Sequence, residues 1–202
     1  MSDAAMSLSD AEWLAHRHDE TNDRIRFVRV ERSFHRQVPF ITDPYLGPGR
    51  ETMELPVSQC LGLPADSPVH FVFHSAFCGS TLLIGAMDHQ GHAMGLSEPQ
   101  LLNDIVGYKR RNGPLQAVAR AGDAALRLLA RPFAPGEAVV IKPSNVVNSL
   151  AQLLLGLRPD ARAVFLYAPL GTFLASVAHK GLHCRVWARE LLEGLLVDGL
   201  ID

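Results

Sequence analysis

Apolar residues change their spacing along the chain, and the pattern predicts strands alternating with helices from Val69 onward. Short runs of apolar and β-branched residues, typical of buried strands, occupy residues 69–73, 93–96, 138–141 and 163–167. Apolar positions at helical spacing predict helices over residues 80–87, 101–111, 114–130, 146–157, 172–179 and 185–200. This alternation favours right-handed crossovers, so we expect an α/β fold with a parallel sheet flanked by helices.

The first third of the chain follows a different pattern. Ser9 and Glu12 have the spacing of a capping box, which predicts a short helix running through Trp13 and His16. Residues 25–30 alternate and are rich in β-branched side chains, which predicts a strand. We therefore expect residues 1–68 to be a small N-terminal extension, packed on one α/β domain of residues 69–202.

Composition excludes several other classes of protein. The chain has 202 residues, 48% of them hydrophobic and 20% charged, which is ordinary for one globular domain. The net charge of −2 gives no basic field for nucleic acid or a membrane surface. No uncharged apolar run approaches the ~20 residues of a bilayer span, and the polar, acidic N-terminus is not a secretory signal. The three cysteines form no CxxC motif. We expect a cytoplasmic protein with no nucleic acid or membrane partner.

Two histidine-containing runs have spacings that resemble metal ligands. They are His89 with His92, and His179 with His183 and Cys184. Neither run has a carboxylate at a useful spacing, so we expect no metal site.

The loop after the first predicted parallel strand suits an anion. Small residues there open a helix, whose first N–H groups and positive dipole end attract phosphate-like groups. Gly79 and Thr81 fit the nucleotide-binding pattern GxxxxGK[ST], whereas Ser80 replaces its lysine and His74 its first glycine. The alternative is an ordinary strand-to-helix connection with a serine N-cap.

Two charged residues follow the next two predicted strands. Lys142 is one of only three lysines among 19 basic residues, and its place at a strand end indicates an anion rather than a metal. Glu98 faces the same edge of the sheet and is a candidate general base for a hydroxyl. The alternatives are a lysine that extends from a strand end into solvent, and a carboxylate that caps a turn or helix.

Taken in order, residues 77–83, 94–99, 140–145 and 157–169, followed by Ser176, resemble the P-loop sulfotransferases over about residues 69–180. The bacterial and tyrosylprotein-type branches are the most similar. The resemblance implies a fold like that of P-loop nucleoside triphosphate hydrolases, and PAPS (3′-phosphoadenosine 5′-phosphosulfate) as donor, released as PAP. It also implies that Glu98 takes the acceptor's proton and that Lys142 stabilises charge on the oxygen between sulfur and phosphorus. The implied cofactor-binding residues are His74, Cys78, Gly79, Ser80, Thr81, Leu82 and Ser176.

The chain departs from the family at two positions. Phe77 stands where the family has a basic residue, and Ala168 stands where it has an arginine. Each change removes a charge-assisted contact of about 1.5–3 kcal/mol. His74, Lys180 and Arg185 are the candidate substitutes.

Three functions stay open at this point. The first is transfer of a sulfuryl group from PAPS to a hydroxyl or amine of a small molecule or peptide. The second is an ATP- or GTP-dependent phosphotransferase, and the third is a non-catalytic P-loop protein for binding or assembly. The chain is short for the family, which leaves a C-terminal truncation open. The apolar helix around Trp187 is expected to be core, or a surface for a partner or second copy.

Overall fold

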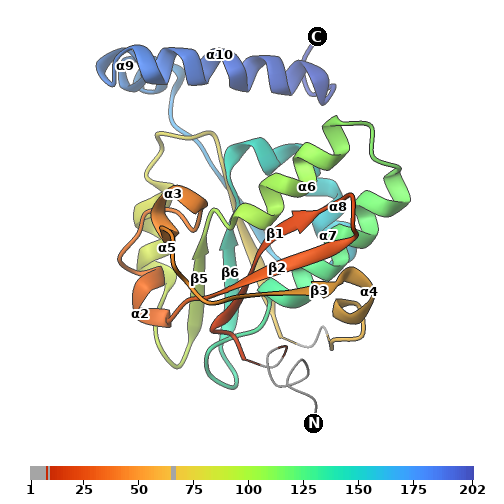
Figure 1. Ribbon diagram of the computed structural model, residues 1–202. Helices are drawn as coiled ribbons and strands as arrows, with labels where there is room; N and C mark the ends of the chain where they lie inside the picture. Colours follow the sequence, from red (N-terminus) through yellow and green to blue (C-terminus); the bar gives the residue numbers. More distant parts are fainter. Residues whose placement is uncertain (1–7, 9, 65–66) are drawn as a thin grey trace.

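A four-stranded parallel sheet forms the centre of the protein in the computed structural model, which describes residues 8, 10–64 and 67–202. Its strands are β4 (Val69–His74), β5 (Ala93–Ser97), β6 (Ala138–Lys142) and β7 (Ala163–Leu166), in the spatial order β5-β6-β4-β7. Figure 1 shows helices on both sides of this sheet, so the expected α/β class is confirmed.

The central strands carry apolar side chains on both faces of the sheet, and helices cover both faces. Helix α5 (Ser80–Met87) covers one face, where Ile84 packs on Val72 and Val140. The other face is covered by α6 (Gln100–Arg110), α7 (Leu115–Leu129), the 3-10 helix η1 (Asn145–Leu150) and α8 (Ala151–Leu157). The predicted helix over residues 146–157 is therefore two shorter segments of different type.

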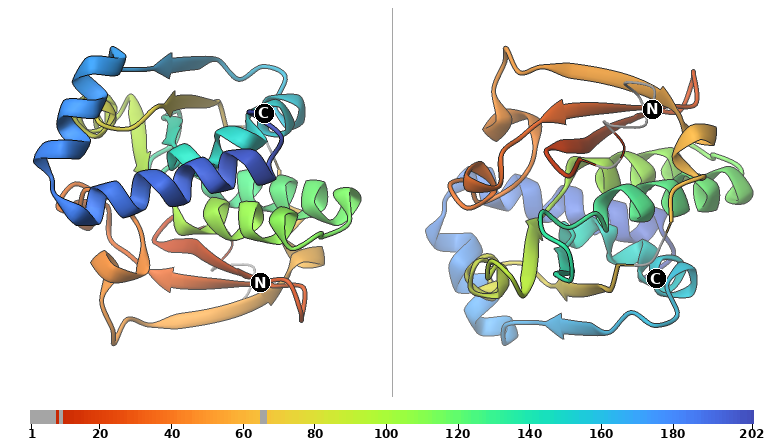
Figure 2. Two further views of the ribbon diagram at one scale, coloured as in Figure 1. Left: turned by 90° about the horizontal axis from the view of Figure 1, so that it is seen from above. Right: turned by 90° about the horizontal axis from the view of Figure 1, so that it is seen from below.

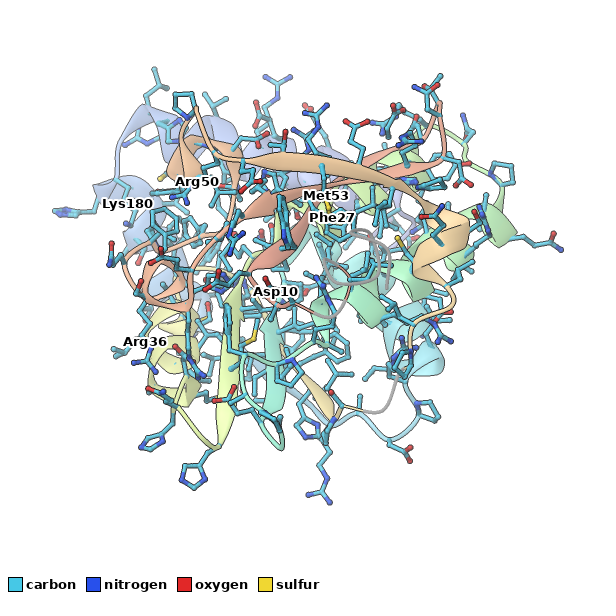
Figure 3. The ribbon with its side chains drawn as sticks, turned by 60° about the horizontal axis from the view of Figure 1, so that its bottom comes forward. Asp10, Phe27, Arg36, Arg50, Met53 and Lys180 are labelled. Atoms are coloured by element: carbon cyan, nitrogen blue, oxygen red, sulfur yellow. The ribbon has the colours of Figure 1, made fainter. Side chains whose placement is uncertain are left out.

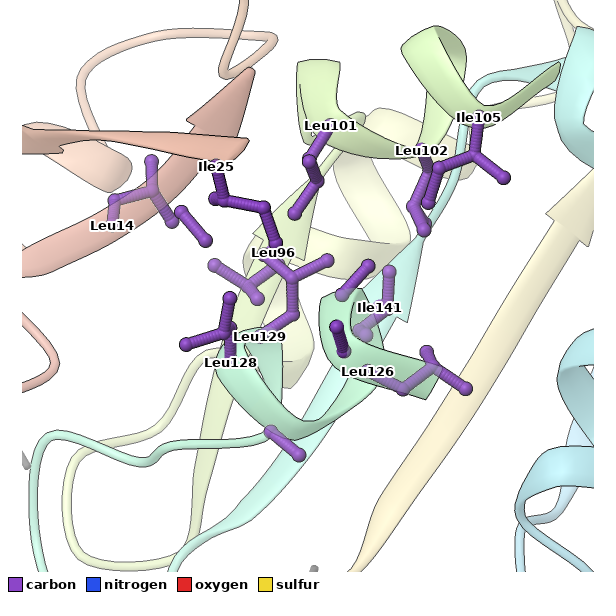
Figure 4. Packing of buried hydrophobic residues seen from close by; sticks show 14 of the residues in the cluster. Leu14, Ile25, Leu96, Leu101, Leu102, Ile105, Leu126, Leu128, Leu129 and Ile141 are labelled. Atoms are coloured by element: carbon purple, nitrogen blue, oxygen red, sulfur yellow. The ribbon is translucent and has the colours of Figure 1, made fainter. Parts of the chain in front are cut away.

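A second sheet of three antiparallel strands packs on α6 and α7. It consists of β1 (Trp13–Asp19), β2 (Arg24–Arg29) and β3 (Thr52–Pro56), in that order. Figure 4 shows Leu14 and Ile25 of this sheet in the same cluster as Leu96 of the parallel sheet. The described N-terminal residues thus share one hydrophobic core with the α/β part.

The predicted N-terminal helix is wrong for its described residues, because Trp13 and His16 lie in β1. Ser9 itself lies outside the described residues. The Asp10 carboxylate accepts the N–H of Glu12 at 2.9 Å, so a cap-like hydrogen bond closes a turn and starts no helix. Residues 13–19 form a strand because they pair with β2 and pack against α6. The strand predicted over residues 25–30 is confirmed as β2.

The segment between β2 and β3 runs along the outer edge of β5. It contains the short helices α2 (Arg32–His35) and α3 (Asp43–Leu46), and α4 (Val57–Cys60) follows β3. The Ile41 N–H donates to the Ser97 carbonyl at 2.8 Å, and the Ser97 hydroxyl donates to the Pro39 carbonyl at 2.6 Å. These contacts hold residues 35–41 beside the carboxyl end of β5.

Two C-terminal helices, α9 (Leu170–His179) and α10 (Leu182–Val197), lie across the carboxyl ends of the parallel strands (Figures 1 and 2). Asp198 anchors the far end of α10 by accepting hydrogen bonds from Arg110 at 2.7 Å and Lys109 at 3.3 Å. Much of the apolar surface here is uncovered: Val164 and Phe165 of β7 are 51% and 57% exposed, and Leu192 of α10 is 50% exposed. Within the described residues, no helix has the length and apolar character needed to cross a bilayer.

Candidate functional site

The strand order places a crevice between the ends of β4 and β6. After β4 the chain crosses to the far edge strand β5, whereas after β6 it continues to β7 on the opposite side. The loops that leave β4 and β6 therefore diverge onto opposite faces, and ligands in open α/β sheets bind at such a point. A cavity of about 410 Å³ lies here, lined by the loop after β4, by Ser144 and Asn145 after β6, and by Glu98 after β5.

Glu98, which lines this cavity, forms an ion pair with Lys142, which does not line it. The Lys142 ammonium donates to the Glu98 carboxylate and lies 5.0 Å from the centre of the Phe40 ring. The Lys142 side chain is fully buried, whereas that of Glu98 is 16% exposed and lines the cavity. Burial lowers the pKa of Lys142, and the charge and hydrogen bond of Glu98 oppose that shift. Lys142 thus acts on the cavity through Glu98.

The backbone at Glu98 has a strained conformation, and this conformation sets the direction of the side chain. Its φ of 51° lies in the left-handed region, which a glutamate adopts only at an energetic cost. The Glu98 N–H donates to the Lys142 carbonyl at 2.6 Å, so β5 and β6 stay paired beyond the last strand residue. This hydrogen bond fixes the backbone from which the Glu98 carboxylate reaches the Lys142 ammonium.

His74 joins the loop after β4 to the end of β6. Its Nδ1 accepts the N–H of Ala76 at 3.0 Å, so its Nε2 carries the proton and donates to the Pro143 carbonyl at 3.0 Å. The same Nε2 lies 3.6 Å from the Glu98 carboxylate. The buried imidazole therefore holds the cavity wall in place beside the ion pair.

The loop between β4 and α5 turns sharply and leaves the start of α5 open. Ala76, Phe77 and Gly79 have φ values of 70°, 49° and 85°. Gly79 is the N-cap of α5 and makes no side-chain capping hydrogen bond, so the alternative of a serine N-cap is wrong. The first N–H groups of α5 have no intrahelical acceptor, and Ser80 and Thr81 line the cavity beside them. An anion fits this arrangement.

Helices α9 and α10 contribute the opposite wall. Lys180, His183 and Trp187 line the cavity, and the Lys180 ammonium lies 5.4 Å from the centre of the Phe77 ring. Phe77 also contacts Trp187, with ring centres 5.3 Å apart. A cation therefore lies beside Phe77, the position where the resembled family has a basic residue. Lys180 was one of the candidate substitutes, whereas Arg185 does not line the cavity.

Three of the predicted cofactor-binding residues do not line this cavity. Leu82 is 81% exposed, the Cys78 thiol donates to the Leu166 carbonyl at 3.5 Å, and the Ser176 hydroxyl donates to the Thr172 carbonyl at 2.9 Å. Of the predicted set, the structure brings together His74, Gly79, Ser80 and Thr81 with Glu98, and with Lys142 behind it.

Sequence reasoning missed Phe40, Asn145, His183 and Trp187. The first reaches the cavity because residues 35–41 follow the edge of β5, and the last two reach it because α10 lies over the sheet. Long-range packing makes both arrangements, and no local pattern predicts them. Among the described residues, no group of three or more His, Cys, Asp or Glu side chains is arranged to hold a metal ion.

Comparison of the chain with protein-family models, with curated proteins and with solved structures finds no match in any of the three. The geometry is therefore the basis for any assignment. It combines an open helix start that suits an anion, a carboxylate that can accept a proton, and a buried ammonium that can balance charge. These are the groups that transfer of an anionic group to a hydroxyl requires.

Proposed function

We propose that the protein is a sulfotransferase-like enzyme that moves a sulfuryl group from PAPS to a hydroxyl or amine acceptor. The proposal includes a P-loop type of fold, in which the loop of residues 74–80 holds the phosphosulfate. The observation that carries it is the Glu98–Lys142 pair, whose carboxylate lines a cavity that also includes the start of α5. The resemblance of the strand-end motifs to P-loop sulfotransferases supplies the identity of the donor.

The phosphosulfate end of PAPS fits the cavity. The N–H groups at the start of α5 and the Ser80 hydroxyl provide donors, and Lys180 provides a positive charge. The Gly79 α-carbon faces open space, because nothing lies within 4 Å of where a side chain would begin. A phosphate oxygen can therefore approach the backbone closely.

The 3′-phosphate lacks the contact that the family resemblance implies, because the Ser176 hydroxyl is bonded within α9 and lies outside the cavity lining. Lys180 and His183 line the cavity wall at the junction of α9 and α10, and we assign this phosphate to them. The proposal thus keeps the donor and replaces one of its implied partners.

Each residue of the pair has one role in the reaction. PAPS, when bound, supplies a sulfuryl group that is activated by its phosphate leaving group. Glu98 accepts the proton of the acceptor, which raises the nucleophilicity of the acceptor oxygen or nitrogen. Once Glu98 is neutral, the Lys142 charge is no longer balanced and stabilises the negative charge that develops beside it. His74 holds the loop after β4 against the end of β6 through its two hydrogen bonds, to Ala76 and Pro143.

Calorimetric titration tests the donor. We expect PAP and PAPS to bind without magnesium with micromolar affinity, and a Lys180→Met variant to bind them about tenfold more weakly. Lys109→Met is the matched control, because Lys109 lies outside the cavity and should leave the affinity unchanged. Binding of ATP only with magnesium would establish the phosphotransferase instead. Absence of binding by all three nucleotides would leave a non-catalytic protein.

Glu98→Gln separates catalysis from binding. The amide keeps the shape of the side chain and cannot take a proton at neutral pH, so transfer should fall at least a hundredfold while PAP affinity changes little. Transfer measured with labelled PAPS at the rate of the unaltered protein would contradict the assigned role of Glu98.

A further inference from the structure

A second cavity adjoins the first and suits an acceptor. It has a volume of about 390 Å³ and lies between α5, the outer edge of β5 and residues 35–39. Thr81 lines both cavities. Ser97, in the wall of the second cavity, directly precedes Glu98 in the wall of the first. The two cavities therefore share Thr81 and meet at the end of β5, where the chain passes from Ser97 to Glu98.

The edge of β5 offers a free pair of main-chain groups in this cavity. Leu96 and Glu98 direct their backbone groups toward β6, since the Glu98 N–H donates to the Lys142 carbonyl at 2.6 Å. Gly95 and Ser97 therefore direct theirs outward. Among the described residues, the Gly95 carbonyl and the Ser97 N–H have no hydrogen-bond partner. Both residues line the cavity.

The free pair is limited to one residue's length. On one side, the Ala93 carbonyl already accepts from Arg32 at 3.0 Å, and the Gly95 N–H donates to Asp88 at 3.4 Å. On the other side, the Ser97 carbonyl accepts from Ile41 at 2.8 Å. One –NH–CHR–CO– unit lying parallel to β5 satisfies the pair, because its N–H donates to the Gly95 carbonyl and its C=O accepts from Ser97. A longer strand finds no further free group on this edge.

We propose that this second cavity is the acceptor site, and that it takes a single N-acylated amino acid that carries a hydroxyl. The inference rests on the proposed sulfuryl transfer for the identity of the reaction. The cavity lining includes Gln37, Thr81 and the ion pair of Arg36 with Asp88, and no Phe, Tyr or Trp ring. Figure 3 shows Arg36 and Lys180, which line the second and first cavities, on the same side of the molecule.

The transfer balances with the groups named. The acceptor oxygen forms the new bond to sulfur as the bond from sulfur to the bridging oxygen of PAPS breaks. The electron pair of that bond leaves on PAP, and the proton of the acceptor hydroxyl goes to Glu98. No oxidant, reductant or further reactant is required.

Gly85 provides a variant that fills the cavity without disturbing the fold. It lies on the α5 wall with helical backbone, and nothing lies within 4 Å of where its side chain would begin. Gly85→Leu should therefore place a side chain at the cavity wall, starting from a Cβ that meets no other atom of the protein. Gly171→Leu is the matched control, because Gly171 is also helical and open but lies in α9 and outside this cavity.

The experiment is an NMR titration with N-acetyl-L-serinamide, following the backbone amide signal of Ser97, together with sulfation measured from labelled PAPS. We expect the Ser97 signal to shift on titration in the unaltered protein and in Gly171→Leu, and to stay constant in Gly85→Leu. Methylation of the serine nitrogen removes the N–H that donates to Gly95, and should weaken binding about tenfold. A ten-residue peptide with an internal serine should bind no more tightly than the single residue.

Several results would overturn the inference. The first three are a Ser97 signal that does not respond, equal binding of the methylated and unmethylated probes, and tenfold tighter binding of the long peptide. The fourth is a Ser97 signal that shows the probe bound, without sulfation of the probe, in a protein that does bind PAPS. Failure of the proposed function is distinguishable. In that case neither PAP nor PAPS binds, while the Ser97 signal still reports the probe in the cavity and Gly85→Leu still abolishes that response.

Discussion

The Glu98–Lys142 pair allows a double-mutant cycle whose outcome follows from burial. Lys142→Met keeps most of the side-chain volume and removes the charge, which leaves the Glu98 carboxylate without its ammonium. Removing one partner of a buried pair destabilises proteins by about 3–5 kcal/mol. Glu98 is 16% exposed and retains some contact with water, so the lower end, about 3 kcal/mol, is expected. Glu98→Gln strands an ammonium whose side chain is 0% exposed, so its effect on the free energy of unfolding should be the larger one.

The double variant Lys142→Met/Glu98→Gln removes both charges. A buried pair replaced by neutral groups of similar volume loses little stability, so the double variant should be more stable than either single variant. Urea unfolding monitored by tryptophan fluorescence measures all four free energies. Lys109→Met is the control: its partner Asp198 keeps Arg110, so a change below about 1 kcal/mol is expected. If both single variants lose less than about 1 kcal/mol and their effects add, the pair is not a buried coupled unit and the reasoning fails.

Three further predictions concern other parts of the chain. Burial lowers the pKa of His35 from 6.5 to about 4, so the unfolded chain binds a proton that the folded one does not. Relative to His35→Phe, the unaltered protein should therefore lose about 3 kcal/mol of its free energy of unfolding as the pH falls from about 6.5 to about 4. Urea titrations of both proteins measure this loss. Parallel pH profiles of the two proteins would contradict it. Arg32 binds the carboxylates of Asp88 and Glu137, whose side chains are 6% and 0% exposed, so Arg32→Met should destabilise the protein by about 3–5 kcal/mol. The control Arg24→Met removes an exposed ion pair and should cost at most about 1 kcal/mol. Similar losses in both variants would refute the assignment of Arg32 to a buried ion pair. Gly79→Ala should lower the melting temperature, since φ is 85° there and the strain is about 1–2 kcal/mol, whereas Gly85→Ala should raise it by adding about 1 kcal/mol of helix propensity.

Local pattern was sufficient for the parallel sheet and most of its helices. The predicted helix over residues 80–87 has the bounds of α5, and the four predicted strands are β4 to β7 with ends shifted by at most one residue. Buried strands and amphipathic helices have spacings that persist whatever they pack against. At Trp13 the same reasoning failed, because pairing between β1 and β2 outweighed a capping signal that one turn also satisfies.

The candidate site also combines features that the sequence could predict with features that depend on long-range packing. The rule that ligands bind at strand ends selected Glu98, Lys142 and the start of α5. The structure places Glu98 and the start of α5 around one cavity, with Lys142 paired to Glu98. The sequence could not show that Lys142 is buried behind Glu98, since that depends on the Phe40 ring, which residues 35–41 carry to the edge of β5. It also could not show the second cavity, because residues 35–39 on one wall lie more than 40 residues before the walls formed by α5 and β5.

The position of β4 in the sheet has a consequence for how the chain folds as it is synthesised. Phe71 pairs with Ile141 on one side and with Ala163 on the other, so this strand leaves the ribosome long before either neighbour exists. At about 5–20 residues per second, the 70 residues that separate Phe71 from Ile141 take about 4–14 s to translate. During that interval both hydrogen-bonding edges of an apolar strand lack their partner strands, and unpaired edges of this kind are prone to aggregation. Of the four parallel strands, the one that leads into the loop of residues 74–80 thus waits longest for its neighbours during synthesis.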